Sequence, residues 1–134
     1  MLRKRSQAHV LSPCSLIVTV ARCAQRDATT GALEIDVTKF PDGFKPLTSL
    51  AHSLGLKIGI YTSVSAVTCG GFAGSLHHEE LDSQTFVEWG FDFIKHDSCG
   101  QDYSVHDGGL QNATLRMRDG IAAASTKAGR PVVG

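Results

Sequence analysis

The 134-residue chain has the length of a single domain, and its composition, 42% hydrophobic and 19% charged, is that of an ordinary globular protein. Thirteen basic residues balance thirteen acidic ones, so the chain has no overall attraction to nucleic acid or to anionic membranes. Its longest uncharged apolar stretch, residues 16–21, is far shorter than the ~20 residues of a membrane-spanning helix. We therefore expect neither a nucleic-acid nor a membrane partner. A closed (β/α)8 barrel, which takes roughly 250 residues, is also excluded by length.

Residues 1–24 differ in character from the rest of the chain. A basic start at residues 3–5 precedes an apolar stretch over residues 10–24 that ends in small side chains, which is the layout of a secretory signal peptide. Within that stretch, Ile17, Val18 and Val20 suit a buried strand of a parallel sheet equally well. Two interpretations of residues 1–24 stay open: a signal-like segment or a divergent first strand.

The first periodic segment, residues 42–55, is predicted to be a helix. Its apolar residues recur every three or four positions and so share one face: Phe44, Leu47, Leu50, Ala51 and Leu54. Asp42 is expected to cap the start of this helix, and Gly55 to end it. Residues 56–61 follow as a short β-rich segment, and the next dozen residues, through Gly74, are expected to form a loop.

The second half of the chain repeats this order. Residues 78–89 are predicted to be a helix that ends at Gly90, with these residues on one face: Leu81, Thr85, Phe86 and Trp89. Residues 91–96 form the next predicted strand, residues 110–128 a third helix closed by Gly129, and residues 131–133 the start of a further strand. Strands that alternate with helices indicate a parallel sheet.

The long loops of this pattern all follow strands, and they carry glycine, cysteine and aspartate residues. In barrels and in open α/β sheets alike, the chemistry lies at the carboxyl ends of the strands. No G-x-G-x-x-G motif follows a strand, so the usual dinucleotide site is not indicated. The pattern therefore favours a segment of a barrel over an open nucleotide-binding sheet.

Asp97 is the candidate for chemistry at the end of the second clear strand. Lys95 lies two positions earlier, and the period of two in a strand places both on the same face. A nearby cation keeps a carboxylate ionised, as a nucleophile of a covalent glycosidase mechanism must be. The local pattern is also that of a surface aspartate that caps the loop or pairs with Lys95.

The four cysteines, at positions 14, 23, 69 and 99, include no C-x-x-C pair and no zinc spacing, so no metal site is expected. Cys69 and Cys99 both follow predicted strands and could meet at one end of the sheet; a bridge between them would indicate an oxidising compartment. Asn112-Ala113-Thr114 is an N-glycosylation sequon, which matters only in a secreted chain.

A long, ordered series of motifs over roughly residues 25–134 resembles the α-galactosidases of glycoside hydrolase family 27. The series begins upstream with Arg26-Asp27 and the sequence KFPDG over residues 39–43, and GLKIGIY follows over residues 55–61. It continues with Thr68-Cys69, Gly74-Ser75-Leu76, His78-Glu79-Glu80, Thr85-Phe86, Trp89-Gly90 and Lys95-His96-Asp97-Ser98-Cys99.

The resemblance implies a role for each matched position. Asp97 would be the nucleophile that attacks the anomeric carbon of a terminal α-galactose, and Lys95 would hydrogen-bond the sugar hydroxyls. Tyr61 would line the galactose pocket, and Cys69 would lie at its edge, bridged to Cys99. The partner would be an α-galactoside, with no cofactor, and the compartment the secretory pathway, either extracellular or lysosomal/vacuolar. The implied fold is α/β, a partial (β/α)8 TIM barrel of roughly the first half, with an incomplete catalytic domain over residues 25–134.

Two departures from the family pattern limit the expected activity. The family's Asp-Asp-Cys-Trp motif, whose carboxylates hold the galactose hydroxyls, is replaced by Val20-Ala21-Arg22-Cys23. In the family, the acid/base aspartate lies more than 37 residues beyond the nucleophile. Only 37 residues follow Asp97 in this sequence. Retaining glycosidases need two carboxyl groups, so we expect an α-galactosidase-like hydrolase whose 134 residues are inactive alone. The alternatives are an α-N-acetylgalactosaminidase or a non-catalytic remnant of the family. His96 also replaces an aromatic residue common in the family.

Overall fold

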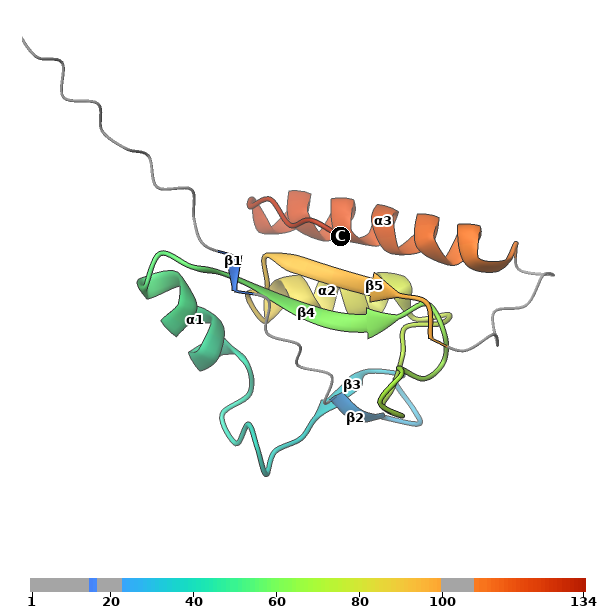
Figure 1. The fold of residues 1–134 in the computed structure, drawn as a ribbon, viewed down its shortest axis with the longest axis horizontal. Helices are drawn as coiled ribbons and strands as arrows, with labels where there is room; N and C mark the ends of the chain where they lie inside the picture. The colour runs from blue at the N-terminus through green and yellow to red at the C-terminus, as the bar shows by residue number, and fades with distance from the viewer. Residues whose placement is uncertain (1–14, 17–22, 100–107) are drawn as a thin grey trace, which may run out of the picture.

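The structure is a computed structural model that describes residues 15–16, 23–99 and 108–134. Its strands form a three-stranded parallel sheet and a two-stranded antiparallel hairpin (Figure 1). In the sheet, β1 (Ser15–Leu16) pairs with β4 (Lys57–Ser63), which pairs in turn with β5 (Phe93–Asp97). The hairpin, which was not predicted, joins β2 (Cys23–Arg26) to β3 (Leu33–Ile35).

Three helices alternate with the strands of the parallel sheet, as the sequence predicts. α1 (Lys45–Ser53) precedes β4, α2 (Glu79–Glu88) lies between β4 and β5, and α3 (Gly109–Ala128) follows β5. After α3, Val133 forms a parallel bridge with Phe93, so a further strand begins where it was expected. Among the described residues the strands do not close into a barrel; they form an α/β arc of parallel strands backed by helices (Figure 1).

The two faces of the sheet have different roles. Ile58 and Ile60 of β4 and Ile94 of β5 point to one face, where all three helices contribute to a single apolar core. The helix and loop residues of that core include Phe44, Ala51, Phe86, Phe91, Met117 and Ile121. The alternate residues point to the opposite face, away from the helices. That second face is where the predicted site residues lie.

A buried ion pair fastens the hairpin to the helical layer. The guanidinium of Arg26, on β2, donates to both carboxylate oxygens of Asp82 on α2, with 2.8 Å to Oδ1. It also donates to the carbonyl oxygens of Gly31 at 2.8 Å and Gly74 at 2.6 Å. The carboxylate of Asp82 is fully buried and accepts a further hydrogen bond from the Ser75 hydroxyl at 2.6 Å. Hairpin, helix and the loop after β4 are therefore held at one point.

The start of α1 differs from the prediction. Asp42 does not cap this helix: the N-cap residue is Phe44, and no side chain caps the first turn. Pro46 lies in that first turn instead, where a residue without an N–H leaves no donor unsatisfied. Gly55 follows the helix with a φ of +71°, so the predicted glycine end is confirmed.

The apolar face predicted for α1 is only partly buried. Phe44, Thr48 and Ala51 face the core, whereas Leu50 and Leu54 are 57% and 65% exposed. The apolar stripe is thus buried on one side only, and Leu54 lies at the C-cap, beyond the last residue of the helix.

The face predicted for α2 is partly right, because Phe86 is buried and Trp89 packs against the core. Leu81, however, is 36% exposed, and the buried side chains of this helix are Glu79, Asp82, Ser83, Phe86 and Val87. The polar members of this set are buried because each has a partner from a distant segment or its own helix, such as Arg116 on α3, which donates to Glu79 at 2.8 Å. Hydrophobic periodicity carries no information about such partners.

His96 lies on the helix-facing side of β5 and is partly buried. Neither of its ring nitrogens has a hydrogen-bond partner among the described residues. Burial lowers the pKa of His96, against the opposing effect of the nearby Glu79 and Asp82 carboxylates. The unfolded chain, with an ordinary histidine pKa of about 6.5, therefore binds its proton first as the pH falls. Acidification below that pH therefore lowers the stability of the folded chain, because folding must then displace the proton or bury a charged ring.

We predict that His96→Phe raises the free energy of unfolding by about 1 kcal/mol at neutral pH and by more at pH 5.5, because it removes an unsatisfied buried polar ring. Denaturant unfolding of both chains at pH 7.5 and pH 5.5 measures the effect. His77→Gln, at an exposed histidine, is the control and should leave the pH dependence unchanged. An identical pH dependence for wild type and His96→Phe would contradict the prediction.

Candidate functional site

Four polar or aromatic side chains meet where β4 and β5 end. The register of the two strands pairs Tyr61 with Lys95 and Ser63 with Asp97. Because side chains alternate along a strand, all four lie on the face turned away from the helices. Gly59 and Phe93 precede them on the same face, and a Cβ at Gly59 would come within 2.9 Å of the Phe93 ring, so only glycine leaves room for it.

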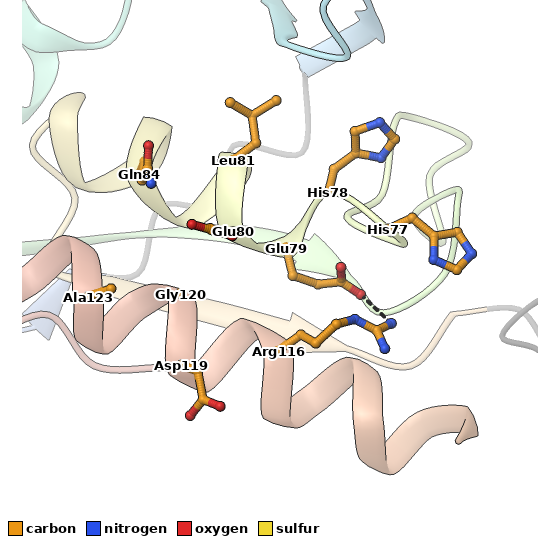
Figure 2. A pocket seen from close by; sticks show the side chains of 10 residues that line it. All are labelled: His77, His78, Glu79, Glu80, Leu81, Gln84, Arg116, Asp119, Gly120 and Ala123. Carbon is orange, nitrogen blue, oxygen red and sulfur yellow. Dashed lines mark hydrogen bonds and ion pairs between the residues drawn. The ribbon is translucent and has the colours of Figure 1, made fainter. Parts of the chain in front are cut away.

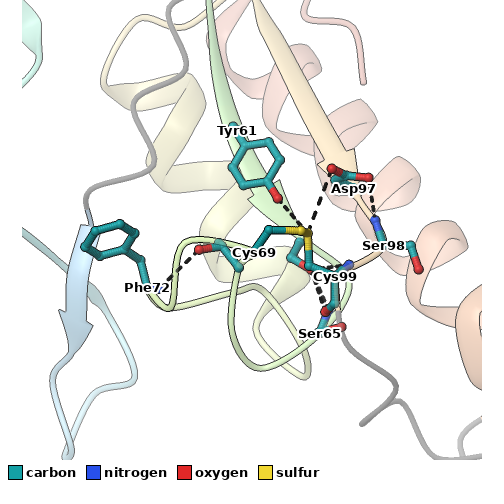
Figure 3. Close-up of a disulfide and its surroundings, with 9 residues drawn as sticks. Tyr61, Ser65, Cys69, Phe72, Asp97, Ser98 and Cys99 are labelled. Atoms are coloured by element: carbon teal, nitrogen blue, oxygen red, sulfur yellow. Dashed lines mark hydrogen bonds between the residues drawn. A yellow bond between two sulfur atoms is a disulfide. The ribbon is translucent and has the colours of Figure 1, made fainter.

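A disulfide joins the loops that follow the two strands (Figure 3). Cys69 and Cys99 are bonded to each other, with their Cα atoms 5.1 Å apart, as the resemblance implies. Cys99 is buried, whereas Cys69 lies exposed at the tip of its loop. The bridge spans 30 residues and therefore connects the segment after β4 to the residue two positions beyond Asp97.

Tyr61 lies between this disulfide and the charged side chains. Its hydroxyl donates a hydrogen bond to Sγ of Cys99 at 2.8 Å, since a disulfide sulfur has no proton to give. The ammonium of Lys95 lies 5.7 Å from the centroid of the Tyr61 ring, which is a cation–π distance. Burial raises the pKa of Tyr61, and the nearby negative charge of Asp97 adds to the rise, so the phenol stays neutral.

Asp97 presents a half-buried carboxylate at the end of β5. Its Oδ1 accepts the N–H of Ser98 at 2.8 Å, so it does cap the turn that follows the strand. Its Oδ2 lies 3.9 Å from Sγ of Cys99 (Figure 3). A carboxylate that is oriented by a backbone donor, flanked by a lysine and open to solvent on one side can act as a nucleophile.

Ser63 is the site residue that the sequence analysis missed. It is fully buried, and its hydroxyl accepts the N–H groups of Ser65 and Cys99, each at 3.2 Å. The available signal was alternation, because Ser63 lies two residues after Tyr61 and so shares its face. The expected loop began too early, at position 62, whereas β4 continues through Ser63.

The one cluster of possible metal ligands found among the described residues does not form a metal centre. Cys69, Asp97 and Cys99 offer ligand atoms that lie within 4.8 Å of one another. The two sulfurs are bonded to each other, however, and a metal binds cysteine as the free thiolate. The loop aspartates at positions 102 and 107, and the residues at positions 20–22, lie outside the described residues.

A groove of about 770 Å³ lies away from these strand ends, between α2 and α3 (Figure 2). Histidine, acidic and small residues line it, and the ion pair of Glu79 with Arg116 joins the two helices there. No predicted site residue belongs to this groove. None of the described helices has the length and apolar character needed to cross a bilayer.

Comparison with known proteins matches this chain to one family. The family model described as "Alpha galactosidase A" covers residues 15–133. "Probable alpha-galactosidase B" of Talaromyces emersonii is 53% identical over 75 residues, which are 56% of this chain and 17% of that protein. "Alpha-galactosidase mel1" of Schizosaccharomyces pombe is 38% identical over 108 residues, 81% of this chain and 24% of that protein. The chain thus spans less than a quarter of these relatives.

Solved structures show the same likeness in the fold. The crystal structure of alpha-galactosidase I from Mortierella vinacea superposes with a TM-score of 0.69 at 36% identity, covering 89% of this chain and 29% of that one. The Saccharomyces cerevisiae α-galactosidase with raffinose has a TM-score of 0.69 at 30% identity, covering 88% and 25%. A putative alpha-N-acetylgalactosaminidase from Bacillus halodurans, at 18% identity and a TM-score of 0.59, shares the fold alone. The predicted partial (β/α)8 barrel is confirmed.

Closure of a 30-residue loop by the disulfide leads to a stability prediction. Replacing Cys69 and Cys99 together by serine should lower the free energy of unfolding by about 3.5 kcal/mol, because the unfolded chain regains the entropy of the open loop. Denaturant unfolding under non-reducing conditions measures the loss. The Cys14→Ser variant is the control, and a loss of equal size in that variant would contradict the assignment.

Proposed function

The chain belongs to the α-galactosidase A family, and we propose that the ends of β4 and β5 form the nucleophilic half of a retaining α-galactosidase site. The observation that carries the proposal is the position of Asp97. Its carboxylate lies at the carboxyl end of a parallel strand, on the face opposite the apolar core, with Lys95 and Tyr61 beside it. Catalytic groups of barrel enzymes occupy this end of the strands.

In this proposal, the Asp97 carboxylate attacks the anomeric carbon of a terminal α-galactose. The bond from that carbon to the leaving oxygen breaks, a covalent glycosyl-enzyme forms, and water then hydrolyses it. Lys95 donates hydrogen bonds to the sugar hydroxyls, and the ring of Tyr61 forms an apolar wall of the pocket with Cys69 at its edge. The cation–π contact with Tyr61 limits the freedom of the Lys95 side chain and so holds its ammonium close to the sugar.

The second carboxyl group of a retaining site, ~5–5.5 Å from the first, protonates the leaving oxygen. In this proposal that group comes from a barrel strand beyond those described here. The 134 residues then supply a nucleophile without its proton donor, a group typically worth 10²–10⁴-fold in rate.

A galactoside is favoured over an N-acetylgalactosaminide as the substrate. The relatives at 38% and 53% identity are α-galactosidases, and one solved relative is described with raffinose. The structure related to α-N-acetylgalactosaminidases is only 18% identical, so its likeness supports the fold and not the substrate. A non-catalytic remnant of the family is the remaining alternative, and aryl galactoside hydrolysis that requires Asp97 would separate the two.

We predict no detectable hydrolysis of melibiose by the 134-residue chain and at most slow hydrolysis of an aryl α-galactoside, whose phenolate leaves without a proton donor. The measurement is phenolate release by the wild-type chain and by Asp97→Asn, which keeps the shape of the side chain but removes the nucleophile. Asp119→Asn, at an exposed aspartate of α3, is the control for loss of a carboxylate elsewhere.

Two results would contradict this assignment. Robust melibiose turnover that Asp97→Asn abolishes would mean that a second carboxylate of this chain acts as the acid. Aryl galactoside hydrolysis that survives in Asp97→Asn would mean that Asp97 is not the nucleophile.

We propose further that the protein passes through the secretory pathway. A disulfide between Cys69 and Cys99 is typical of oxidising compartments. The chain also contains a single asparagine, Asn112, and it lies within the sequon Asn112-Ala113-Thr114. In α3 the residues Asn112 and Thr114 are exposed while Ala113 faces the core, so the acceptor side of the sequon is turned to solvent.

Passage through the secretory pathway predicts that the chain carries one N-linked glycan when it is made in a eukaryotic secretory host. Mass spectrometry before and after peptide-N-glycosidase treatment would show the loss of a glycan from Asn112. Thr114→Ser should keep the modification and Thr114→Ala should abolish it, since only the first preserves the sequon. Secretion of an unmodified wild-type chain would contradict the prediction.

A further inference from the structure

We propose that Ser63 is a positioning residue that sets the geometry of Asp97 and of the Cys69–Cys99 disulfide. The proposal rests on the proposed function only for the role of Asp97. It assigns Ser63 no contact with the sugar. Its effect comes through the backbone of Cys99, which the Ser63 hydroxyl holds at the point where β4 and β5 separate.

The position of Ser63 is unusual for a serine. It is fully buried at the end of β4, and its partner in the strand register is Asp97. The paired register stops at Ser63 and Asp97, and among the described residues only Val64 beyond it still donates across to Asp97, so the N–H groups of Ser65 and Cys99 lie past the strand ladder. Buried N–H groups in such a place need other acceptors.

The Ser63 hydroxyl supplies them. A hydroxyl has two lone pairs and one proton, and all three are used here. It accepts the N–H groups of Ser65 and of Cys99, both at 3.2 Å, and it donates to the carbonyl oxygen of Cys99 at 3.4 Å. One side chain therefore joins the turn after β4 to the turn after β5.

The backbone around Ser63 strengthens this junction. The N–H of Val64 donates to the carbonyl oxygen of Asp97 at 2.8 Å, and the carbonyl oxygen of Ser63 accepts the N–H of Ser75, also at 2.8 Å. The chain around Asp97 is thus held at two points: Val64 binds the carbonyl oxygen of Asp97, and the Ser63 hydroxyl binds the N–H of Cys99, two residues later. The carboxylate lies between these two anchors, with Oδ1 on the N–H of Ser98.

Loss of the hydroxyl would leave the N–H groups of Ser65 and Cys99 buried without an acceptor, because Ser65 is fully buried and Cys99 is 5% exposed. The turn after β5 would loosen to let water reach them. Cys99 would then meet Cys69 at a lower effective concentration, and the disulfide would be reduced more easily. A more mobile backbone at Cys99 would also make the Asp97 carboxylate, two residues earlier, more mobile.

The test is the equilibrium of the 134-residue chain with glutathione, in which two glutathione thiols reduce the disulfide and leave as glutathione disulfide. Ser63→Ala should become half-reduced at roughly tenfold less reducing conditions than the wild type, the size expected for one unsatisfied buried donor. Ser63→Thr, which keeps the hydroxyl, should return toward the wild-type midpoint.

Ser83→Ala is the matched control. Ser83 is equally buried, and its hydroxyl donates to the carbonyl oxygen of Glu79 at 2.6 Å within α2, away from the disulfide. A merely destabilising loss of a buried hydroxyl should act in both variants alike. The proposal expects a shift in Ser63→Ala and none in Ser83→Ala; equal midpoints for the two would overturn it.

Amide hydrogen exchange of the unsubstituted chain tests the same contacts should Ser63→Ala not fold. The amides of Ser65 and Cys99 should exchange slowly, and rapid exchange at both would overturn the proposal. Neither measurement involves a galactoside. Aryl galactoside hydrolysis that survives in Asp97→Asn would therefore reject the proposed function and leave the result for Ser63 standing on its own.

Discussion

The ion pair between Arg26 and Asp82 is the interaction on which most of the described structure depends. A fully buried carboxylate is costly unless it is paired and hydrogen-bonded, and Asp82 has three side-chain donor contacts from two residues. The same guanidinium also reaches two carbonyl oxygens, so it holds the hairpin, α2 and the loop after β4 together. Through Ser75, whose hydroxyl lies 2.7 Å from that of Thr62, this network continues into β4. The loop that carries Cys69 is therefore anchored at its base by this network and at its tip by the disulfide.

The opposite end of the sheet shows how the fold separates stability from chemistry. Near the start of β5, Asp92 lies within 2.7 Å of His52, 3.5 Å of Lys57 and 3.4 Å of Arg130. Burial alone would raise the pKa of Asp92, but the hydrogen bonds from His52 and from the N–H of Ile58, with the positive charges around it, lower the pKa overall. The cations at this end are paired with a buried carboxylate. At the carboxyl end, the ammonium of Lys95 and the carboxylate of Asp97 remain in contact with solvent, as a binding site requires.

Membership of the α-galactosidase A family and the geometry of the strand ends both support the proposed half-site at the ends of β4 and β5. The proposed nucleophile Asp97, with Lys95 and Tyr61, comes from two adjacent strands, so a short arc of barrel is enough to bring these side chains together. Proton donation in a retaining glycosidase requires a carboxyl group on the far side of the glycosidic bond. In the proposed mechanism that group comes from another strand of the barrel, so the site would divide between this arc and the rest of the barrel.

The sequence by itself determined the order of helices and strands, their parallel arrangement, and the family. It also placed Tyr61, Lys95 and Asp97 at strand ends, because hydrophobic period, glycine positions and motif order are local properties of the chain. Only the tertiary structure decided the burial of Asp82 and Glu79, the exposure of Leu50 and Leu54, and the roles of Ser63 and the hairpin. The burial of Asp82 and Glu79 and the role of Ser63 each depend on a partner distant in the sequence. A buried polar group is tolerated where another segment of the chain supplies its hydrogen-bond partner, and the local sequence pattern does not show that partner.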